Sequence, residues 1–320
     1  QQSAHLTQHQ RAGLQTSSKM LWSTVAFSAL CRPAIVPLER RTVALSTGLQ
    51  MEWLSQPAPS AMSHPVLFVH GTFHGAWCWA EHWMPHFAAA QIECHAVSLR
   101  GSEGSPSDAA TVRTAEHVAD LAAFVEEHLR RPPVMVGHSY GGAFLLKYLE
   151  QGGAAAGAAL LCSVPPSGNG PMTGRYLRRL QLRQTWRITR GFALKQAATD
   201  ADLARELFFD GALPADTLAR YVAHFAADST CGLDLADFLR TLPSKAADGA
   251  TGRASWLPGA PPLLVAGAEC DAIVDAEATE ETARFCGVEP RVLRGLPHDV
   301  MLATGWESAA DEVAEWCRSL

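Results

Sequence analysis

One serine of the chain lies in a pattern typical of a catalytic nucleophile. Ser139 is the central residue of GHSYG at 137–141, which has the form G-x-S-x-G. In this pattern a sharp turn between a strand and a helix exposes the serine, and the flanking glycines leave room for neighbouring chain. An apolar stretch at 133–136 precedes the turn, and a helix-forming stretch at 143–149 follows it. We therefore expect Ser139 to attack the carbonyl carbon of a substrate.

A serine hydroxyl is a weak nucleophile until a general base accepts its proton. In proteins that carry G-x-S-x-G between a strand and a helix, this base is a histidine that comes last of the three catalytic residues along the chain. The chain has 13 histidines, and His298 is the one that directly follows the last strand-like stretch, 292–296. We expect His298 to be the general base.

The imidazole needs an acid to orient it, and the loop after the preceding strand-like stretch supplies candidates. Asp271 follows the apolar stretch 263–266, and Glu269 and Asp275 are competing carboxylates close to it. The loop after 158–162 is an alternative place for the acid, but it has no carboxylate nearby. We favour Asp271, which gives the order serine, aspartate, histidine along the chain.

Hydrogen-bond donors for a tetrahedral oxyanion are expected on both sides of the serine. One is the backbone N–H of Tyr140, at the start of the following helix. The other is the backbone N–H of Thr72, in the loop after the apolar stretch 66–69, and Phe73 is the next candidate for this role. We also expect Phe73 and His74, in the same loop, to contact the substrate.

No metal and no cofactor are expected at this site. His70, His74, His82 and His86 could suggest a metal site, but no set of carboxylates and histidines has the spacing of metal ligands. The eight cysteines form no C-x-x-C pair, and we interpret most of them as buried free thiols in a reducing compartment. The predicted chemistry therefore depends on side chains and backbone groups alone.

Strand-like and helix-like stretches alternate along most of the chain. The stretch 114–129 has apolar residues at steps of three and four, as in an amphipathic helix, whereas 66–69 is a continuous apolar run typical of a buried parallel strand. This alternation predicts an α/β fold with a mostly parallel central sheet and helices on both faces. Further strands are expected at 42–46, 51–56, 92–99, 133–136, 158–162, 263–266 and 292–296, and further helices at 80–90, 143–149, 278–285 and 307–320.

The alternation is interrupted at residues 167–250, which are mostly helical in character. We interpret this segment as a helical cap inserted into a core that comprises 42–166 and 251–320. The cap has seven basic residues and no acid between residues 175 and 195, and in a single helix five arginines would share one face. These are Arg175, Arg179, Arg183, Arg187 and Arg190. Such a face either keeps the cap soluble or docks it on anionic lipid at a membrane surface.

Composition restricts the partners and the location of the protein. The 320 residues are 48% hydrophobic with a net charge of −6, which argues against a nucleic-acid partner. No stretch reaches the roughly 18 consecutive apolar residues of a membrane-spanning helix. Residues 1–41 are hydroxyl-rich, with five basic residues and one acid, as in a transit peptide. We expect a plastid protein, with a mitochondrial, secreted or cytoplasmic one as the alternatives. The oligomeric state is not predicted.

The residues of the expected triad and the glycine-containing motifs around them resemble those of the α/β-hydrolase superfamily. The resemblance extends from about residue 42 to 320 and implies the α/β-hydrolase fold. HGTFHGAWCW, at 70–79, is similar to the branch of plant methylesterases and hydroxynitrile lyases, and SLRG, at 98–101, resembles the general esterase and lipase branch. The stretches 271–275 and 298–302 look like those of plastid-targeted hydrolases of plants and algae. The resemblance implies hydrolysis of an ester or related acyl bond, without a cofactor, in a small-molecule or lipid-like substrate.

Fold does not settle the substrate, so three functions stay open. The leading hypothesis is a carboxylic-ester hydrolase that forms an acyl-enzyme on Ser139. One alternative is a lyase that uses the same triad for acid–base chemistry, which cyanohydrin cleavage would distinguish from ester turnover. The other is a receptor that keeps the triad to hold a ligand and has negligible turnover. A serine at 139 argues against haloalkane dehalogenases and soluble epoxide hydrolases, which resemble this fold but have aspartate there.

Overall fold

The computed structural model describes residues 37–58, 62–228 and 231–320. The chain divides into Gln1–Ala34 and Ile35–Leu320, and the description that follows concerns the second unit. Most of the transit-like segment lies outside the described residues. Its expected end is wrong, because the first strand of the core begins at Glu39, inside the segment that we assigned to the leader. This strand belongs to the core because all its residues pair with the next strand.

Eight strands form the central sheet. They are β1 (Glu39–Ala44), β2 (Gln50–Gln56), β3 (Val66–Val69), β4 (Cys94–Val97), β6 (Val134–His138), β7 (Gly157–Leu161), β9 (Leu263–Ala268) and β10 (Arg291–Leu293). Their order across the sheet is β1-β2-β4-β3-β6-β7-β9-β10. The β1–β2 and β2–β4 pairs are antiparallel and all others are parallel, so the expected mostly parallel sheet is confirmed.

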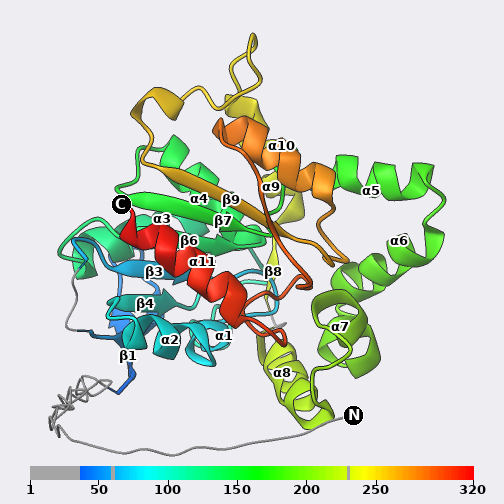
Figure 1. Cartoon of the computed structure of the whole chain (residues 1–320), viewed down its shortest axis with the longest axis horizontal. Coiled ribbons are helices and arrows are strands. Elements are labelled where there is room, and N and C mark those ends of the chain that lie inside the picture. The colour runs from blue at the N-terminus through cyan, green and yellow to red at the C-terminus, as the bar shows by residue number, and fades with distance from the viewer. Residues whose placement is uncertain (1–36, 59–61, 229–230) are drawn as a thin grey trace, which may run out of the picture. The chain divides into compact units, whose positions relative to one another are not determined.

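Helices cover both faces of this sheet (Figure 1). The strand residues alternate between two apolar clusters: in β3, Val66 and Phe68 belong to one cluster, and Leu67 and Val69 to the other. The first cluster includes α1 (Trp77–Ala80), α2 (Trp83–Ala89) and α11 (Glu307–Arg318), and the second includes α3 (Thr114–His128) and α4 (Tyr140–Glu150), with much of α10 (Ala276–Cys286). All residues of β3, β4, β6 and β7 are buried, and apart from His95 in β4 and His138 in β6 these strands have no polar side chain.

The segment between β7 and β9 forms the cap, which is mainly helical. Its helices are α5 (Asn169–Arg178), α6 (Leu182–Ile188), α7 (Ala201–Phe208), α8 (Ala215–Asp228) and α9 (Leu235–Arg240), with short helical turns at Thr189–Ala193, Gln196–Ala198, Pro243–Ala246 and Leu257–Gly259. It also has one very short strand, β8 (Gly232–Leu233), which pairs with β5 (Thr111–Val112) of the core. No described helix is both long and apolar enough to cross a bilayer.

Residues 175–195 do not form the single helix in which five arginines would share one face. Helix α5 ends at Arg178, Leu180 has a left-handed backbone with φ of 55°, and α6 begins at Leu182. A left-handed residue breaks the helical path, so the arginines do not form one stripe. They pair with acids of α10 and α7 instead: Arg175 with Asp275, Arg179 with Glu277, Arg187 with Glu206, and Arg190 with Asp200.

Candidate active site

Ser139 lies on the turn between β6 and α4, as the G-x-S-x-G pattern predicts. Its backbone has φ of 55° and ψ of −121°, a conformation that costs a non-glycine residue on the order of 1–3 kcal/mol. The flanking glycines are needed because a Cβ on Gly141 would lie 2.5 Å from the His70 carbonyl oxygen, and one on Gly137 would lie 2.9 Å from the Gly141 backbone. The structure therefore keeps a strained turn at the serine, which is typical of functional sites.

His298 and Asp271 meet in the interior, although they come from different loops. His298 Nδ1 donates to Asp271 Oδ2 at 2.8 Å, and both side chains are buried. The backbone N–H groups of Ile273 and Val274 each donate to Asp271 Oδ1 at 2.8 Å, so both carboxylate oxygens are held. Burial lowers the pKa of His298, but the charge and hydrogen bond of Asp271 outweigh it, and the pKa of His298 lies above its ordinary value.

The competing carboxylates have other partners. Glu269 binds Arg294 and the backbone N–H of Gly295 at the surface. Asp275 accepts from the backbone N–H of Ala278, where it caps α10, and it pairs with Arg175 of the cap. The structure therefore brings Asp271, of the three, to the imidazole.

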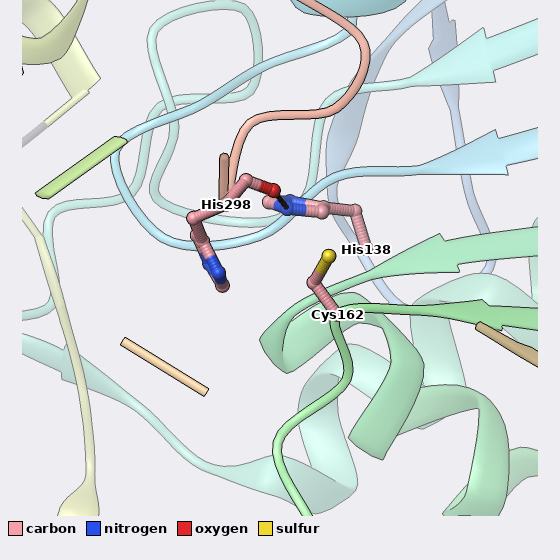
Figure 2. Close-up of side chains that lie close together, drawn as sticks. All are labelled: His138, Cys162 and His298. Carbon is pink, nitrogen blue, oxygen red and sulfur yellow. Dashed lines mark hydrogen bonds between the residues drawn. The ribbon is translucent and has the colours of Figure 1, made fainter. Parts of the chain in front are cut away.

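His298 lies beside the residue that precedes the nucleophile. Its backbone carbonyl accepts from His138 Nε2 at 3.0 Å, and the two rings are 4.7 Å apart (Figure 2). Among the hydrogen bonds of the described residues, none joins Ser139 to His298. Catalytic hydrogen bonds are often long in enzymes without substrate and shorten when the substrate binds.

His138, Cys162 and His298 form a small cluster that the sequence did not reveal (Figure 2). Their nitrogen and sulfur atoms lie within 4.8 Å of one another, and hydrogen bonds hold His298 Nδ1 and His138 Nε2 while His138 Nδ1 has no hydrogen-bond partner among the described residues. Burial and the nearby Asp271 charge hold the pKa of the Cys162 thiol well above its ordinary value. The sequence offered one signal for Cys162. This residue directly follows β7, at the loop that we considered as an alternative place for the acid of the triad.

The expected oxyanion donors flank Ser139. Tyr140 is the first residue of α4, so its N–H has no acceptor within the helix. On the other side, a Cβ on Gly71 would lie 2.8 Å from Ser139 Cβ, which places the Gly71–Thr72 peptide against the nucleophile. Tyr140 directly follows Ser139, and Thr72 directly follows the glycine that packs against it.

The two residues expected to contact the substrate differ in their surroundings. Phe73 is buried, with φ of 66°, and packs against aromatic rings of the cap. These rings are Phe192, Phe208 and Phe225, at centroid distances of 5.5, 6.1 and 5.9 Å. His74 has both ring nitrogens occupied, Nδ1 by the Thr72 carbonyl oxygen at 2.7 Å and Nε2 by Asp299 Oδ2 at 2.9 Å. The imidazole ring of His74 therefore has no free nitrogen to offer a substrate.

The cap closes the site in this structure. Ser139, His298 and Asp299 are all buried, and Phe208 of the cap lies 6.0 Å from the His298 ring. Cavities of about 480 and 400 Å³ lie elsewhere, at the ends of α3 and α4 and beside the C-terminus, and no triad residue lines them. Ser139 and His298 are therefore almost entirely shielded from solvent in this structure.

Solved structures with the same fold serve different chemistries. An esterase from Thermogutta terrifontis has a TM-score of 0.64 at 17% identity, covering 88% of this chain and 98% of its own. A haloalkane dehalogenase variant from Bradyrhizobium elkanii has a TM-score of 0.62 at 17% identity, covering 88% and 96%. At these identities the likeness shows the fold alone.

Sequence comparison defines the family. Methylesterase 10 of Arabidopsis thaliana is 36% identical to this chain over 84 residues. These residues cover 25% of this chain and 29% of that protein. The match agrees with the resemblance of the stretch 70–79 to plant methylesterases. The chain thus spans less than a third of the length of this curated relative. Residues 66–316 match the model of the alpha/beta hydrolase family. The match covers most of the core and the whole cap, and the protein is a member of the alpha/beta hydrolase family.

Proposed function

We propose that the protein hydrolyses a carboxylic ester through Ser139, His298 and Asp271. The observation that carries this proposal is the buried His298–Asp271 hydrogen bond of 2.8 Å next to a serine on a strained strand-to-helix turn. Three residues far apart in the sequence converge there in the order that this fold uses for acyl transfer. The match to Methylesterase 10 favours an ester over other substrates.

Each residue has one role in the proposed reaction. Ser139 Oγ forms a bond with the acyl carbon while His298 Nε2 accepts its proton, and the carbonyl oxygen becomes an oxyanion that the Thr72 and Tyr140 N–H groups stabilise. The imidazolium then gives this proton to the departing alcohol as the ester bond breaks. Water repeats the sequence on the acyl-enzyme and releases the acid. Asp271 holds Nδ1 protonated throughout, so that Nε2 is free to accept.

The surroundings favour an apolar substrate. The rings of Phe73, Phe192, Phe208 and Phe225 form a continuous aromatic cover next to His298. Such a cover excludes water and favours an acyl or alcohol group without charge. We therefore infer a small or lipid-like ester whose apolar part displaces these rings when the cap opens.

A labelling experiment tests the proposed chemistry. A fluorophosphonate should react once per chain, and mass spectrometry should map the adduct to Ser139. Ser139→Ala should abolish labelling and reduce kcat by several orders of magnitude, on the order of 10⁶ in a serine enzyme of this type. A panel of p-nitrophenyl esters of increasing chain length then identifies the preferred acyl group. An adduct on another serine, or binding of esters without turnover, would refute the proposal.

We further propose that the cap contacts membranes through exposed apolar residues between α5 and the turn after α6. Leu180 is 80% exposed and Trp186 is 58% exposed, and none of the residues of α6 is buried. The other exposed apolar residues of this segment are Leu177, Leu182 and Leu194. Four acids pair with five of the seven basic residues of the segment, and seven positive charges against four negative ones leave it net positive. Exposed apolar side chains beside positive charge suit an anionic lipid surface.

Vesicle co-sedimentation tests this contact. The protein should bind vesicles of phosphatidylcholine mixed with phosphatidylserine more strongly than phosphatidylcholine alone, and high salt should weaken binding. Leu180→Glu with Trp186→Glu should abolish binding. Leu235→Glu with Leu239→Glu, two equally exposed leucines of α9, is the matched control and should leave binding intact. Equal binding of both lipids, or self-association of the chain that the first pair of substitutions removes, would contradict the proposal.

A further inference from the structure

A second histidine–aspartate pair lies immediately behind the proposed triad. His74 Nε2 and Asp299 Oδ2 are 2.9 Å apart, and both side chains are fully buried. The two residues are separated by 225 positions in the sequence. His74 belongs to the loop that follows β3, and Asp299 directly follows the proposed base His298. The pair thus joins the loop that carries one oxyanion donor to the loop that carries the base.

The hydrogen bonds of His74 fix the number of protons on this pair. A carbonyl oxygen can only accept, so Nδ1, at 2.7 Å from the Thr72 carbonyl oxygen, must carry a hydrogen. A hydrogen must also lie between Nε2 and Asp299 Oδ2, because a bare nitrogen lone pair would repel a carboxylate at 2.9 Å. The pair is therefore either an imidazolium with a carboxylate or a neutral imidazole with a carboxylic acid. Both forms hold one more proton than a neutral imidazole beside a free carboxylate.

The surroundings hold both residues of the pair in place. The Trp77 ring stacks on His74 at 5.5 Å, and the Phe225 ring of the cap meets it edge-on at 4.8 Å. The backbone N–H of Asp299 donates to the Phe208 carbonyl oxygen of the cap at 3.0 Å. The nearest second titratable group is His138, whose Nε2 lies 3.9 Å from Asp299 Oδ1 and donates to the His298 carbonyl oxygen. The pair is thus held from the core and from the cap.

We propose that His74 and Asp299 are positioning residues that hold the oxyanion loop in its active geometry. The hydrogen bond from His74 Nδ1 fixes the carbonyl of Thr72, and so the plane of the Thr72–Phe73 peptide, which adjoins the Gly71–Thr72 peptide that carries the Thr72 N–H. Gly71, next to Thr72, touches Ser139, so any rotation of this loop moves the oxyanion donor relative to the nucleophile. Because stabilisation of an oxyanion requires donors already in place, the pair acts on the transition state more than on substrate binding.

The two substitutions of Asp299 that test this role differ only in hydrogen bonding. In Asp299→Asn, the amide NH₂ can donate to Nε2 of a neutral His74 whose Nδ1 still donates to Thr72, so both hydrogen bonds survive and kcat should stay within about threefold of wild type. In Asp299→Leu the hydrogen bond at Nε2 is lost and the ring is no longer anchored to the loop of His298, so kcat should fall about 10- to 100-fold, as expected for a misplaced oxyanion donor, with KM nearly unchanged. The affinity for an alkylboronic acid, which mimics the tetrahedral intermediate, should fall by the same factor. The affinity for the carboxylic acid product should not change.

Two further variants address folding. His74→Phe combined with Asp299→Leu replaces the pair by apolar side chains that leave no unpaired charge, so this double variant should fold and still show the loss in kcat. Asp120→Leu removes another fully buried carboxylate, whose hydrogen-bond partners are Thr47 and Arg100 and not residues of the site. This control should lower the melting temperature and leave kcat intact. A folded Asp299→Leu or double variant with wild-type kcat would overturn the proposal, as would an equal loss in Asp299→Asn and Asp299→Leu.

A measurement without substrate separates this inference from the proposed function on which it rests. Amide hydrogen exchange of the peptide that covers residues 70–76 should increase in Asp299→Leu and stay at the wild-type level in Asp299→Asn and Asp120→Leu. If the wild type fails to hydrolyse esters or react with fluorophosphonate but shows this exchange pattern, the proposed chemistry fails and the positioning pair stands. If exchange in the loop is the same in all four proteins, the positioning role is refuted whatever the activity.

Discussion

Replacing Asp271 by asparagine should trap His298 in the wrong tautomer. Asp271 Oδ1 accepts two backbone N–H groups at 2.8 Å, from Ile273 and Val274. An asparagine must keep its oxygen there, because its NH₂ group cannot face two N–H donors. The NH₂ group then faces His298 Nδ1, which can only accept from it, so the imidazole proton moves to Nε2. Nε2 is the atom that must take the proton of Ser139, and the base is blocked.

The size of this effect follows from the same hydrogen bonds. Turning the amide over would free His298 but would leave two buried N–H groups without acceptors, at about 1–3 kcal/mol each. At 1.36 kcal/mol per factor of ten, a total of about 2–6 kcal/mol populates the productive orientation in roughly one molecule in 30 to 3 × 10⁴. We therefore expect Asp271→Asn to lower kcat by about 30- to 3 × 10⁴-fold, a range that includes the roughly 10⁴-fold loss known for such a substitution in a serine protease.

Steady-state hydrolysis of a p-nitrophenyl ester by wild type and variant, with melting temperatures for both, provides the assay. Asp275→Asn is the matched control, because Asp275 caps α10 and pairs with Arg175 without contacting His298. This control should lose stability, by about 1 kcal/mol for a weakened cap, and keep its kcat. The smallest loss that these hydrogen bonds allow is about 30-fold. If Asp271→Asn folds normally and retains more than about a tenth of the wild-type kcat, the assignment of the acid is therefore wrong.

Three further predictions follow from the structure. Because the pKa of His298 is raised above its ordinary value and the neutral base is the active form, kcat/KM should fall as pH decreases through that raised pKa, and the acid limb of the pH profile should lie above pH 6.5. Gly71→Ala places a Cβ 2.8 Å from Ser139 Cβ and should reduce kcat sharply, whereas Gly170→Ala, with nothing within 4 Å, should not; equal activities in an ester assay would contradict the packing. Removal of residues 1–36 should leave activity and melting temperature unchanged, whereas removal of 1–44 deletes β1 and should lower the melting temperature. A fluorescent reporter fused to residues 1–45 should enter plastids. A reporter that stays in the cytosol would refute the transit-peptide hypothesis.

The elements that position the nucleophile could be predicted from sequence because their signals are local. A buried parallel strand is continuously apolar, an amphipathic helix has steps of three and four, and G-x-S-x-G joins one to the other. The helix expected at 114–129 is observed as α3, Thr114–His128, for this reason. The helix expected at 80–90 is instead divided into α1 and α2, because the apolar pattern does not record the break after Ala80. Element type thus follows from periodicity, whereas exact ends depend on local backbone geometry.

The chain order also predicted that His298 would follow the last strand, and β10 ends at Leu293, just before it. The identity of the acid was less certain, because Glu269, Asp271 and Asp275 lie within a few residues of one another. The structure brings Asp271 to the imidazole through two backbone hydrogen bonds that turn its carboxylate inward. Such a choice depends on the path of the loop in space, which no pattern of residue types specifies.

Only the tertiary structure decided what His74, Asp299 and the basic cap residues do. His74 resembled a substrate contact because it lies near the oxyanion loop, but its partner is 225 residues away. The arginines between 175 and 195 look unopposed in the sequence, yet acids from α7 and α10 pair with most of them. Local propensity is encoded by neighbours along the chain, whereas the charge and hydrogen-bond partners of a side chain are set by packing between segments distant in sequence. The sequence by itself therefore determined the residues capable of the chemistry, and the fold decided which of them meet.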